Sequence, residues 1–208
     1  MYFGLIVPAY GYAYFAPGII QTYGYDPIET QLHSVPPWAA AFGFSMLMAT
    51  LSDYTRMRLP FAIFTICVAI TGFGILISVH DYQRLQYGAL FLVTMGAYSA
   101  MPIVVCWFNM NLGGHHRRAV GSAWQVGFGN IGGIIAVFAF LEKDAPKYIP
   151  GYSISISFTI LSIIACIIYG VGCFMANKQR SKMPVDLSLS EHEKTEMGDL
   201  SPEYRYLL

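Results

Sequence analysis

"AVGSAWQVGFGNIGGIIAVFAF", residues 119–140, contains the spacing G-x-G-x-x-G at Gly127, Gly129 and Gly132, which is typical of dinucleotide-binding loops. A dinucleotide-binding loop follows a β-strand, opens a helix and precedes an acidic residue by about 20 positions. Here the glycines lie within a long apolar stretch that carries no charge. We therefore interpret Gly127, Gly129 and Gly133 as small residues that let two membrane helices pack closely, and not as a nucleotide site.

The apolar character of this stretch recurs along the chain. Of the 208 residues, 55% are hydrophobic and 12% charged, against about 25% charged in an average soluble domain. About 20 helical residues cross the hydrocarbon core of a bilayer. We expect membrane-spanning helices at about residues 2–23, 35–52, 59–79, 87–108, 119–141 and 152–176. This predicts an all-α membrane protein with a bundle over residues 1–176 and a disordered cytoplasmic tail over residues 177–208.

The charged residues support this interpretation, because all twelve carboxylates lie in expected loops, at span ends or in the tail. The loops after the second, fourth and sixth spans carry most of the basic residues. These are Arg56, Arg58, Arg117, Arg118, Lys178, Arg180 and Lys182, whereas the alternate loops carry Arg84, Lys143 and Lys147. Basic loops face the cytoplasm, so we expect both termini to be cytoplasmic.

Several polar and aromatic side chains are expected near the middle of the spans. They are Tyr10, Tyr14, Tyr98, Ser99, Gln125 and Asn130. One interpretation is that they form hydrogen bonds and packing contacts between helices; the other is that they line a water-filled substrate cavity. Trp107 lies close to a span end and is expected to be an anchor at the membrane interface.

Other chemistries have little support in the sequence. The four cysteines lie inside spans without the spacing of a disulfide framework or a metal site. Ser153 follows a glycine in "GYSIS", but no histidine lies inside a span to activate it. We therefore expect no enzymatic activity, no cofactor, no metal site and no nucleic-acid partner, and a lipid bilayer as the environment.

Four stretches carry a resemblance to a known family. They are "LSDYTRMR" (51–58), "NLGGHHRRAVGSAWQVGFGNIGGIIA" (111–136), "EKDAPKYIPGYSIS" (142–155) and "MGDLSPEYRYLL" (197–208). Together they resemble the C-terminal six-helix half of a major facilitator superfamily transporter, in the fungal allantoate permease branch of the anion:cation symporter family. The resemblance implies half of a twelve-helix fold, in which substrate binds near the midplane between two six-helix halves.

The resemblance also implies a function, namely proton-coupled transport of small organic anions such as carboxylates, vitamin-like compounds or ureides across the plasma membrane. Asp53, with the basic residues Arg56, Arg58, Arg117 and Arg118, would form a cytoplasmic gating motif, in which Asp53 is attracted to the start of the fifth span. Because the chain begins directly in its first span, we expect a truncated carrier that needs its missing N-terminal half. The alternatives are a half-size carrier that pairs with a second copy, and a membrane protein that does not transport.

Overall fold

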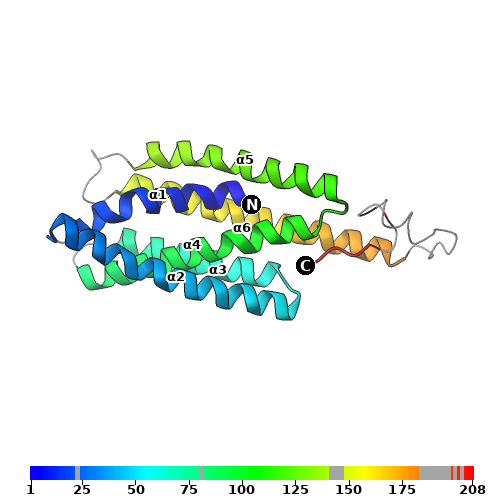
Figure 1. Cartoon of the computed structure of the whole chain (residues 1–208), viewed down its shortest axis with the longest axis horizontal. Helices are drawn as coiled ribbons and strands as arrows, with labels where there is room; N and C mark the ends of the chain where they lie inside the picture. The colour runs from blue at the N-terminus through cyan, green and yellow to red at the C-terminus, as the bar shows by residue number, and fades with distance from the viewer. Residues whose placement is uncertain (22–23, 80–81, 141–147, 183–197, 199–200, 202–203) are drawn as a thin grey trace.

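A computed structural model describes residues 1–21, 24–79, 82–140, 148–182, 198, 201 and 204–208. Within these residues the chain forms six helices and no β-strand (Figure 1). They are α1 (Tyr2–Gln21), α2 (Pro27–Thr55), α3 (Leu59–Ser78), α4 (Gln83–Met110), α5 (His115–Ala139) and α6 (Ile149–Arg180). All six are long and apolar enough to cross a membrane, which confirms the expected all-α membrane architecture.

The helix boundaries follow local signals. Asp26 precedes α2 with extended backbone and Pro27 begins the helix, since proline fits the first helical position, where no backbone N–H partner is needed. At the other end, Arg56 closes α2 in the left-handed conformation (φ 55°) and donates its N–H to the Asp53 carbonyl. The second span therefore begins earlier than residue 35, and Pro36 and Pro37 lie inside it.

The helices approach one another most closely at small residues. Gly96 of α4 lies directly against the α3 backbone, with no room for a Cβ. On α5, Gly132 faces the Phe3 carbonyl of α1, and Gly133 faces the Tyr10 ring. Gly129 faces the ring of Tyr2, so the closest approach of α5 to α1 follows these three glycines.

One expected packing glycine does not fit this arrangement. Nothing lies within 4 Å of the position that a Cβ on Gly127 would occupy, so its side of α5 is open. Gly132, which belonged to the rejected nucleotide motif, takes the packing position instead. Residues 127 and 129 are two apart and therefore point about 160° apart around a helix, so only one of them can face α1.

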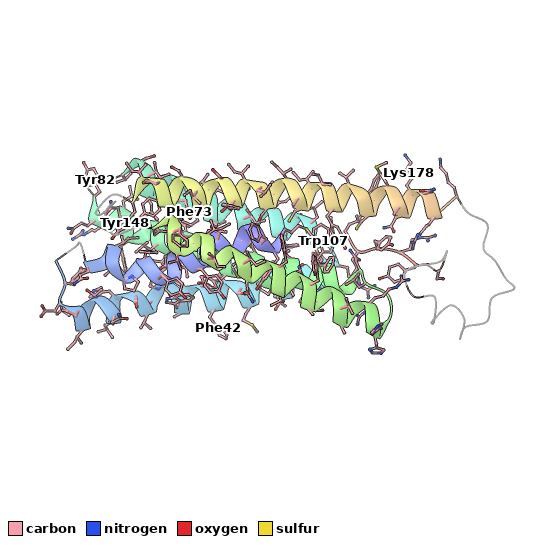
Figure 2. All side chains as sticks on the ribbon, turned by 90° about the horizontal axis from the view of Figure 1, so that it is seen from above. Phe42, Phe73, Tyr82, Trp107, Tyr148 and Lys178 are labelled. Carbon is pink, nitrogen blue, oxygen red and sulfur yellow. The ribbon has the colours of Figure 1, made fainter. Side chains whose placement is uncertain are left out.

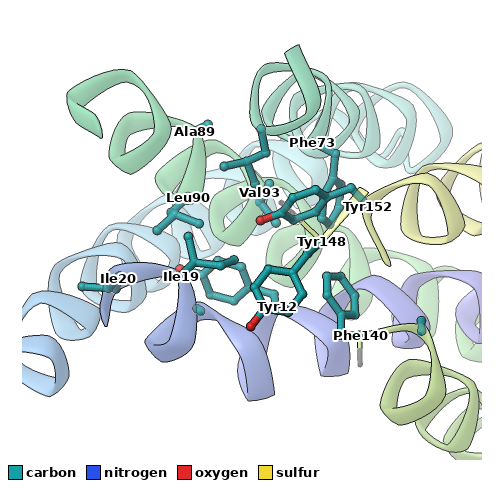
Figure 3. Close-up of a cluster of buried hydrophobic side chains, with 13 residues drawn as sticks. Tyr12, Ile19, Ile20, Phe73, Ala89, Leu90, Val93, Phe140, Tyr148 and Tyr152 are labelled. Carbon is teal, nitrogen blue, oxygen red and sulfur yellow. The ribbon is translucent and has the colours of Figure 1, made fainter. Parts of the chain in front are cut away.

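Two clusters of buried side chains form the core of the described residues, and they lie at different positions along the length of the bundle. One surrounds Tyr12, Phe73, Phe140, Tyr148 and Tyr152, where α1, α3, α4 and α6 converge (Figure 3). The other surrounds Trp107. In Figure 2, Trp107 and Lys178 lie toward the opposite end of the bundle from Tyr82 and Tyr148. We call the end with Lys178, the α2–α3 loop and the α4–α5 loop the basic end.

The tail differs from the sequence expectation wherever it is described. Helix α6 continues to Arg180, beyond the expected limit of the bundle at residue 176. Residues 204–208 return to the basic end and contact the bundle through hydrogen bonds. They are therefore ordered, and not part of a disordered tail. The remainder of the expected tail (183–197) and the expected loop at 141–147 lie outside the described residues.

Candidate functional site

Tyr10, Tyr14 and Asn130 lie together where α1 and α5 meet. The rings of Tyr10 and Tyr14 stack with their centroids 6.2 Å apart, since residues four apart share one face of a helix. The Tyr10 hydroxyl lies 3.5 Å from Asn130 Oδ1, at the long limit of a hydrogen bond. Tyr14 is 62% exposed, so this polar group lies at the surface of the six-helix bundle.

Tyr98 extends this surface across α1 to α4 and α2. Its hydroxyl donates a hydrogen bond to the Ala9 carbonyl at 3.0 Å. Its ring meets Trp38 of α2 edge to face, with the centroids 4.6 Å apart. Trp38 is itself 38% exposed. We call Tyr10, Tyr14, Trp38, Tyr98 and Asn130 the aromatic wall.

Trp38 was not among the residues expected at the site. The expected second span began at about residue 35, which put Trp38 next to a span end, where a tryptophan is typical of an interfacial anchor. The useful signal was the earlier helix start at Asp26-Pro27, which moves Trp38 inward along α2. Trp107, which was expected to be the interfacial anchor, is instead fully buried.

Two other expected cavity residues do not join the wall. Ser99 is fully buried inside the bundle, and its hydroxyl has no hydrogen-bond partner among the described residues. Gln125 precedes Asn130 by five residues, so the two side chains point roughly 140° apart around α5. The Gln125 Oε1 atom is buried and also lacks a described partner.

The chemistry of the wall follows from its residue types. Its phenol, indole and amide groups offer hydrogen-bond donors and acceptors, together with aromatic faces on which a planar ring can stack. None of its residues carries a formal charge. The wall is therefore suited to orient a polar or aromatic ligand, but it cannot neutralise an anionic one.

Charged side chains are concentrated at the basic end, around Arg58. This arginine is buried and forms an ion pair with Asp53, whose side chain is 64% exposed. The Arg58 guanidinium also donates to Ser52 Oγ at 3.2 Å and contacts Met110 Sδ at 3.3 Å. Arg58 therefore connects the α2–α3 loop to the end of α4.

A cavity of about 400 Å³ adjoins this ion pair. Asp53, Arg58, Asn109 and Arg118 are among its lining residues, so the structure brings the loop and the start of α5 to one cavity. The expected partner of Asp53 was the start of α5, with Arg117 and Arg118. The ion pair in the structure is instead with Arg58 of its own loop.

The other members of the expected motif have separate positions. Arg56 is the exposed left-handed residue that ends α2. Arg117 is exposed in the first turn of α5, and the Arg118 guanidinium donates to the Leu112 carbonyl at 3.4 Å. Among the described residues, no cluster of three or more His, Cys, Asp or Glu side chains could hold a metal ion.

The six apolar helices, the uncharged wall and the charged end define a multi-pass membrane protein. The chain is 31% identical to a major facilitator-type transporter of Emericella nidulans over 93% of its length. It is 28% identical to an uncharacterized transporter of Schizosaccharomyces pombe over 96% of its length. It is 26% identical to the high-affinity nicotinic acid transporter of Saccharomyces cerevisiae over 99% of its length.

These similarities support membership of the major facilitator superfamily. The chain spans about 40% of the length of the relatives it matches, with 39% of the S. pombe protein and 40% of the E. nidulans protein covered. The relatives are named as transporters, which gives indirect support to the expectation that the chain is not an enzyme. No family model and no solved structure matches the chain.

Proposed function

We propose that the chain is the C-terminal six-helix half of a secondary transporter for small organic anions, and that the aromatic wall is one side of its substrate cavity. Substrate would cross by alternating access, as this bundle rocks against a second six-helix bundle. The observation that carries the proposal is the exposed position of Tyr14 and of the Asn130 amide on a helix bundle that exposes many large apolar side chains.

The energetics of a bilayer support this reading of the wall. An amide side chain in contact with lipid tails loses its hydrogen bonds with water, which is unfavourable. Asn130 lies well inside α5, and its contact with Tyr10 satisfies at most one of its polar atoms. A cavity or a second bundle beside the wall would supply the remaining partners.

The proposed substrate class is supported by the chemistry of the wall and by the name of one relative. The S. cerevisiae relative is named for nicotinic acid, which has a flat aromatic ring and a carboxylate. Stacked tyrosines and Trp38 suit such a ring, whereas the carboxylate needs a cation. We therefore assign the anion-pairing group and the proton-coupling group to the second bundle, because the wall has neither.

The basic end would be the cytoplasmic gate in this mechanism. The positive-inside rule places the Arg-bearing loops in the cytoplasm, and the resemblance suggests the plasma membrane. The Asp53–Arg58 pair would then fix the α2–α3 loop on the cytoplasmic side, next to Arg118 and the cavity that they share.

Two alternatives give different experimental outcomes. A second copy of this chain could supply the second bundle, or the chain could be a membrane protein that does not transport. The test is uptake of radiolabelled small carboxylates, nicotinic acid among them, into proteoliposomes with an imposed proton gradient. The chain would be reconstituted alone and together with the N-terminal half of the nicotinic acid transporter.

We expect uptake from the combination and none from the chain alone. Uphill accumulation by the chain alone, together with a crosslinked dimer, would favour the half-size carrier. Uptake could be absent in both preparations and also in a screen of a protein that joins this chain to an N-terminal six-helix half. That result would favour the alternative that the chain is a membrane protein without transport activity.

A further inference from the structure

Residues Tyr204–Leu208 form an extended segment that lies against the basic end of the bundle, which we call the strap. In Figure 1 it is the red segment beside the orange end of α6. It contacts the ends of α4 and α6 and the α2–α3 loop, which are distant from it and from one another in the sequence.

Asn111, directly after α4, binds the strap backbone through both atoms of its amide. Its Oδ1 accepts the Leu207 N–H at 2.7 Å, and its Nδ2 donates to the Leu207 carbonyl at 3.1 Å. The same carbonyl accepts a hydrogen bond from the Trp107 indole at 2.8 Å. Asn111 and Trp107 are both buried, so these donors and acceptors have little access to solvent.

Asn177, near the end of α6, repeats this arrangement on the preceding strap residue. Its Oδ1 accepts the Tyr206 N–H at 2.8 Å, and its Nδ2 donates to the Tyr206 carbonyl at 2.8 Å. Arg180, one turn further along α6, donates to the Tyr206 hydroxyl at 3.2 Å, and its guanidinium lies 4.8 Å from the centre of the Tyr206 ring.

Side chains add selectivity to this backbone recognition. Leu207 packs against the core cluster that contains Trp107. The Tyr204 hydroxyl donates to the Met110 carbonyl at 3.0 Å. Proteins that bind extended peptides form hydrogen bonds with the peptide backbone and hold its side chains in separate contacts. Here the two asparagines bond the strap backbone, while apolar and cationic groups contact the strap side chains.

The strap also touches the residue that holds Asp53. The backbone N–H of Arg58 donates to the carboxylate of the last residue, Leu208, while the Arg58 guanidinium pairs with Asp53 and contacts Met110 Sδ. Met110 in turn accepts the hydrogen bond from Tyr204. Arg58 and Met110 are therefore shared between the strap and the Asp53–Arg58 pair.

We propose that the basic end contains a peptide-recognition site, formed by Trp107, Asn111, Asn177 and Arg180, whose ligand is the strap, and that the docked strap holds Arg58 in position to pair with Asp53. The site is an intrachain latch between the tail and the α2–α3 loop. This proposal does not depend on the transport function.

The test is hydrogen–deuterium exchange of the full chain in lipid nanodiscs, followed by mass spectrometry of fragments that cover residues 201–208 and 51–58. Asn111→Leu keeps the branched shape of the side chain and removes both hydrogen bonds to Leu207. We expect the strap amides to exchange roughly tenfold faster in this variant, because two hydrogen bonds are lost. We expect exchange in residues 51–58 to rise about threefold or more, since the two regions are coupled through Arg58.

Asn109→Leu is the matched control. Asn109 lies on the same helix, but its side chain bonds Val105 and Ser122 and not the strap. This variant should leave exchange in the strap unchanged. Leu207→Pro removes the strap N–H without altering any helix, so it gives the same test even if Asn111→Leu misfolds. Both changes act on the contact between Asn111 and Leu207, so their effects on strap exchange should be less than additive in the double variant.

Two results would overturn the proposal. Strap amides of the unaltered chain that exchange as fast as those of a free peptide would show that the site does not bind the strap. A strap released by Leu207→Pro, with exchange in residues 51–58 unchanged, would show that the strap does not hold Arg58.

Discussion

Asn111 and Asn177 at the basic end each make two hydrogen bonds to the strap, whereas Asn130 in the aromatic wall is exposed and has a 3.5 Å contact with Tyr10. The three side chains are chemically identical, and all lie on or directly after long apolar helices. At the basic end the two amides are bonded to the chain's own backbone. At the wall the Asn130 amide faces outward.

This difference distinguishes polar side chains that stabilise the fold from polar side chains that are available to an outside partner. A buried amide without partners is unfavourable, so an amide that is fully bonded inside the chain is explained by folding alone. An exposed amide at mid-span needs a partner that this bundle does not provide. The comparison therefore supports the proposal that the wall is the surface that meets substrate or a second bundle.

The largest difference in folding stability is expected between alanine variants of two tryptophans, Trp107 at the basic end and Trp38 in the aromatic wall. Trp107 is fully buried and bonded to the strap, while Trp38 is 38% exposed. Trp107→Ala should lower the free energy of unfolding by about 3–5 kcal/mol. Trp38→Ala should lower it much less, because its ring is only partly buried. Thermal unfolding in detergent measures both, and equal losses would contradict the division into a structural and a functional region.

The next effect concerns the glycines that place α5 against α1 and thereby set the position of Asn130 relative to Tyr10. Gly132→Val should destabilise the bundle by about 1–3 kcal/mol, because the added side chain meets the Phe3 carbonyl at the helix contact. Gly127→Val is the matched control on the same helix, where the space is open. A similar loss of stability in both variants would show that α5 packs elsewhere.

A smaller effect is expected at the Asp53–Arg58 pair. Asp53→Asn removes the charge opposite buried Arg58, but the Asp53 side chain is 64% exposed, so solvent weakens the interaction. We expect a loss of about 1 kcal/mol or less in the free energy of unfolding. The difference from the unaltered chain should shrink at high salt, because salt screens exposed charges. A loss that does not depend on salt would indicate that the Asp53 carboxylate acts through hydrogen bonds alone.

The smallest effect on stability is expected in the wall itself. Asn130→Leu should change the free energy of unfolding by no more than about 0.5 kcal/mol, because Asn130 makes no strong contact within the chain. Uptake of small carboxylates by the chain combined with an N-terminal half should nevertheless fall markedly. Ile168→Leu, at an exposed apolar position of α6, is the control and should leave uptake unchanged. Normal uptake by Asn130→Leu would remove Asn130 from the substrate cavity.

Much of the fold could be predicted from the sequence because the bilayer imposes a simple rule. Apolar segments of about 20 residues must cross as helices, and charged residues must lie at their ends. All six helices follow this rule. The start of α2 was misplaced because Pro36-Pro37 was taken as a helix boundary, although neighbouring helices allow proline inside membrane helices.

The candidate site was predictable only in part. The pairing of Tyr10 with Tyr14 follows from helical spacing, and it was expected. The roles of Ser99 and Trp38 depend on how α1, α2 and α4 are rotated against one another, which a single sequence does not specify. The strap was missed because its hydrogen bonds join residues about 30 to 100 positions apart, and because a polar tail resembles a disordered one.

The most direct test of the account is the solvent accessibility of the wall in intact membranes. Single cysteines would replace Asn130 and Ile168, an exposed apolar residue of α6, in a full chain whose four native cysteines are changed to serine or alanine. A water-soluble, membrane-impermeant thiosulfonate reagent would then be applied to both. The account predicts that the cysteine at position 130 reacts and the one at position 168 does not. Equal reactivity at the two positions, or none at position 130, would contradict it.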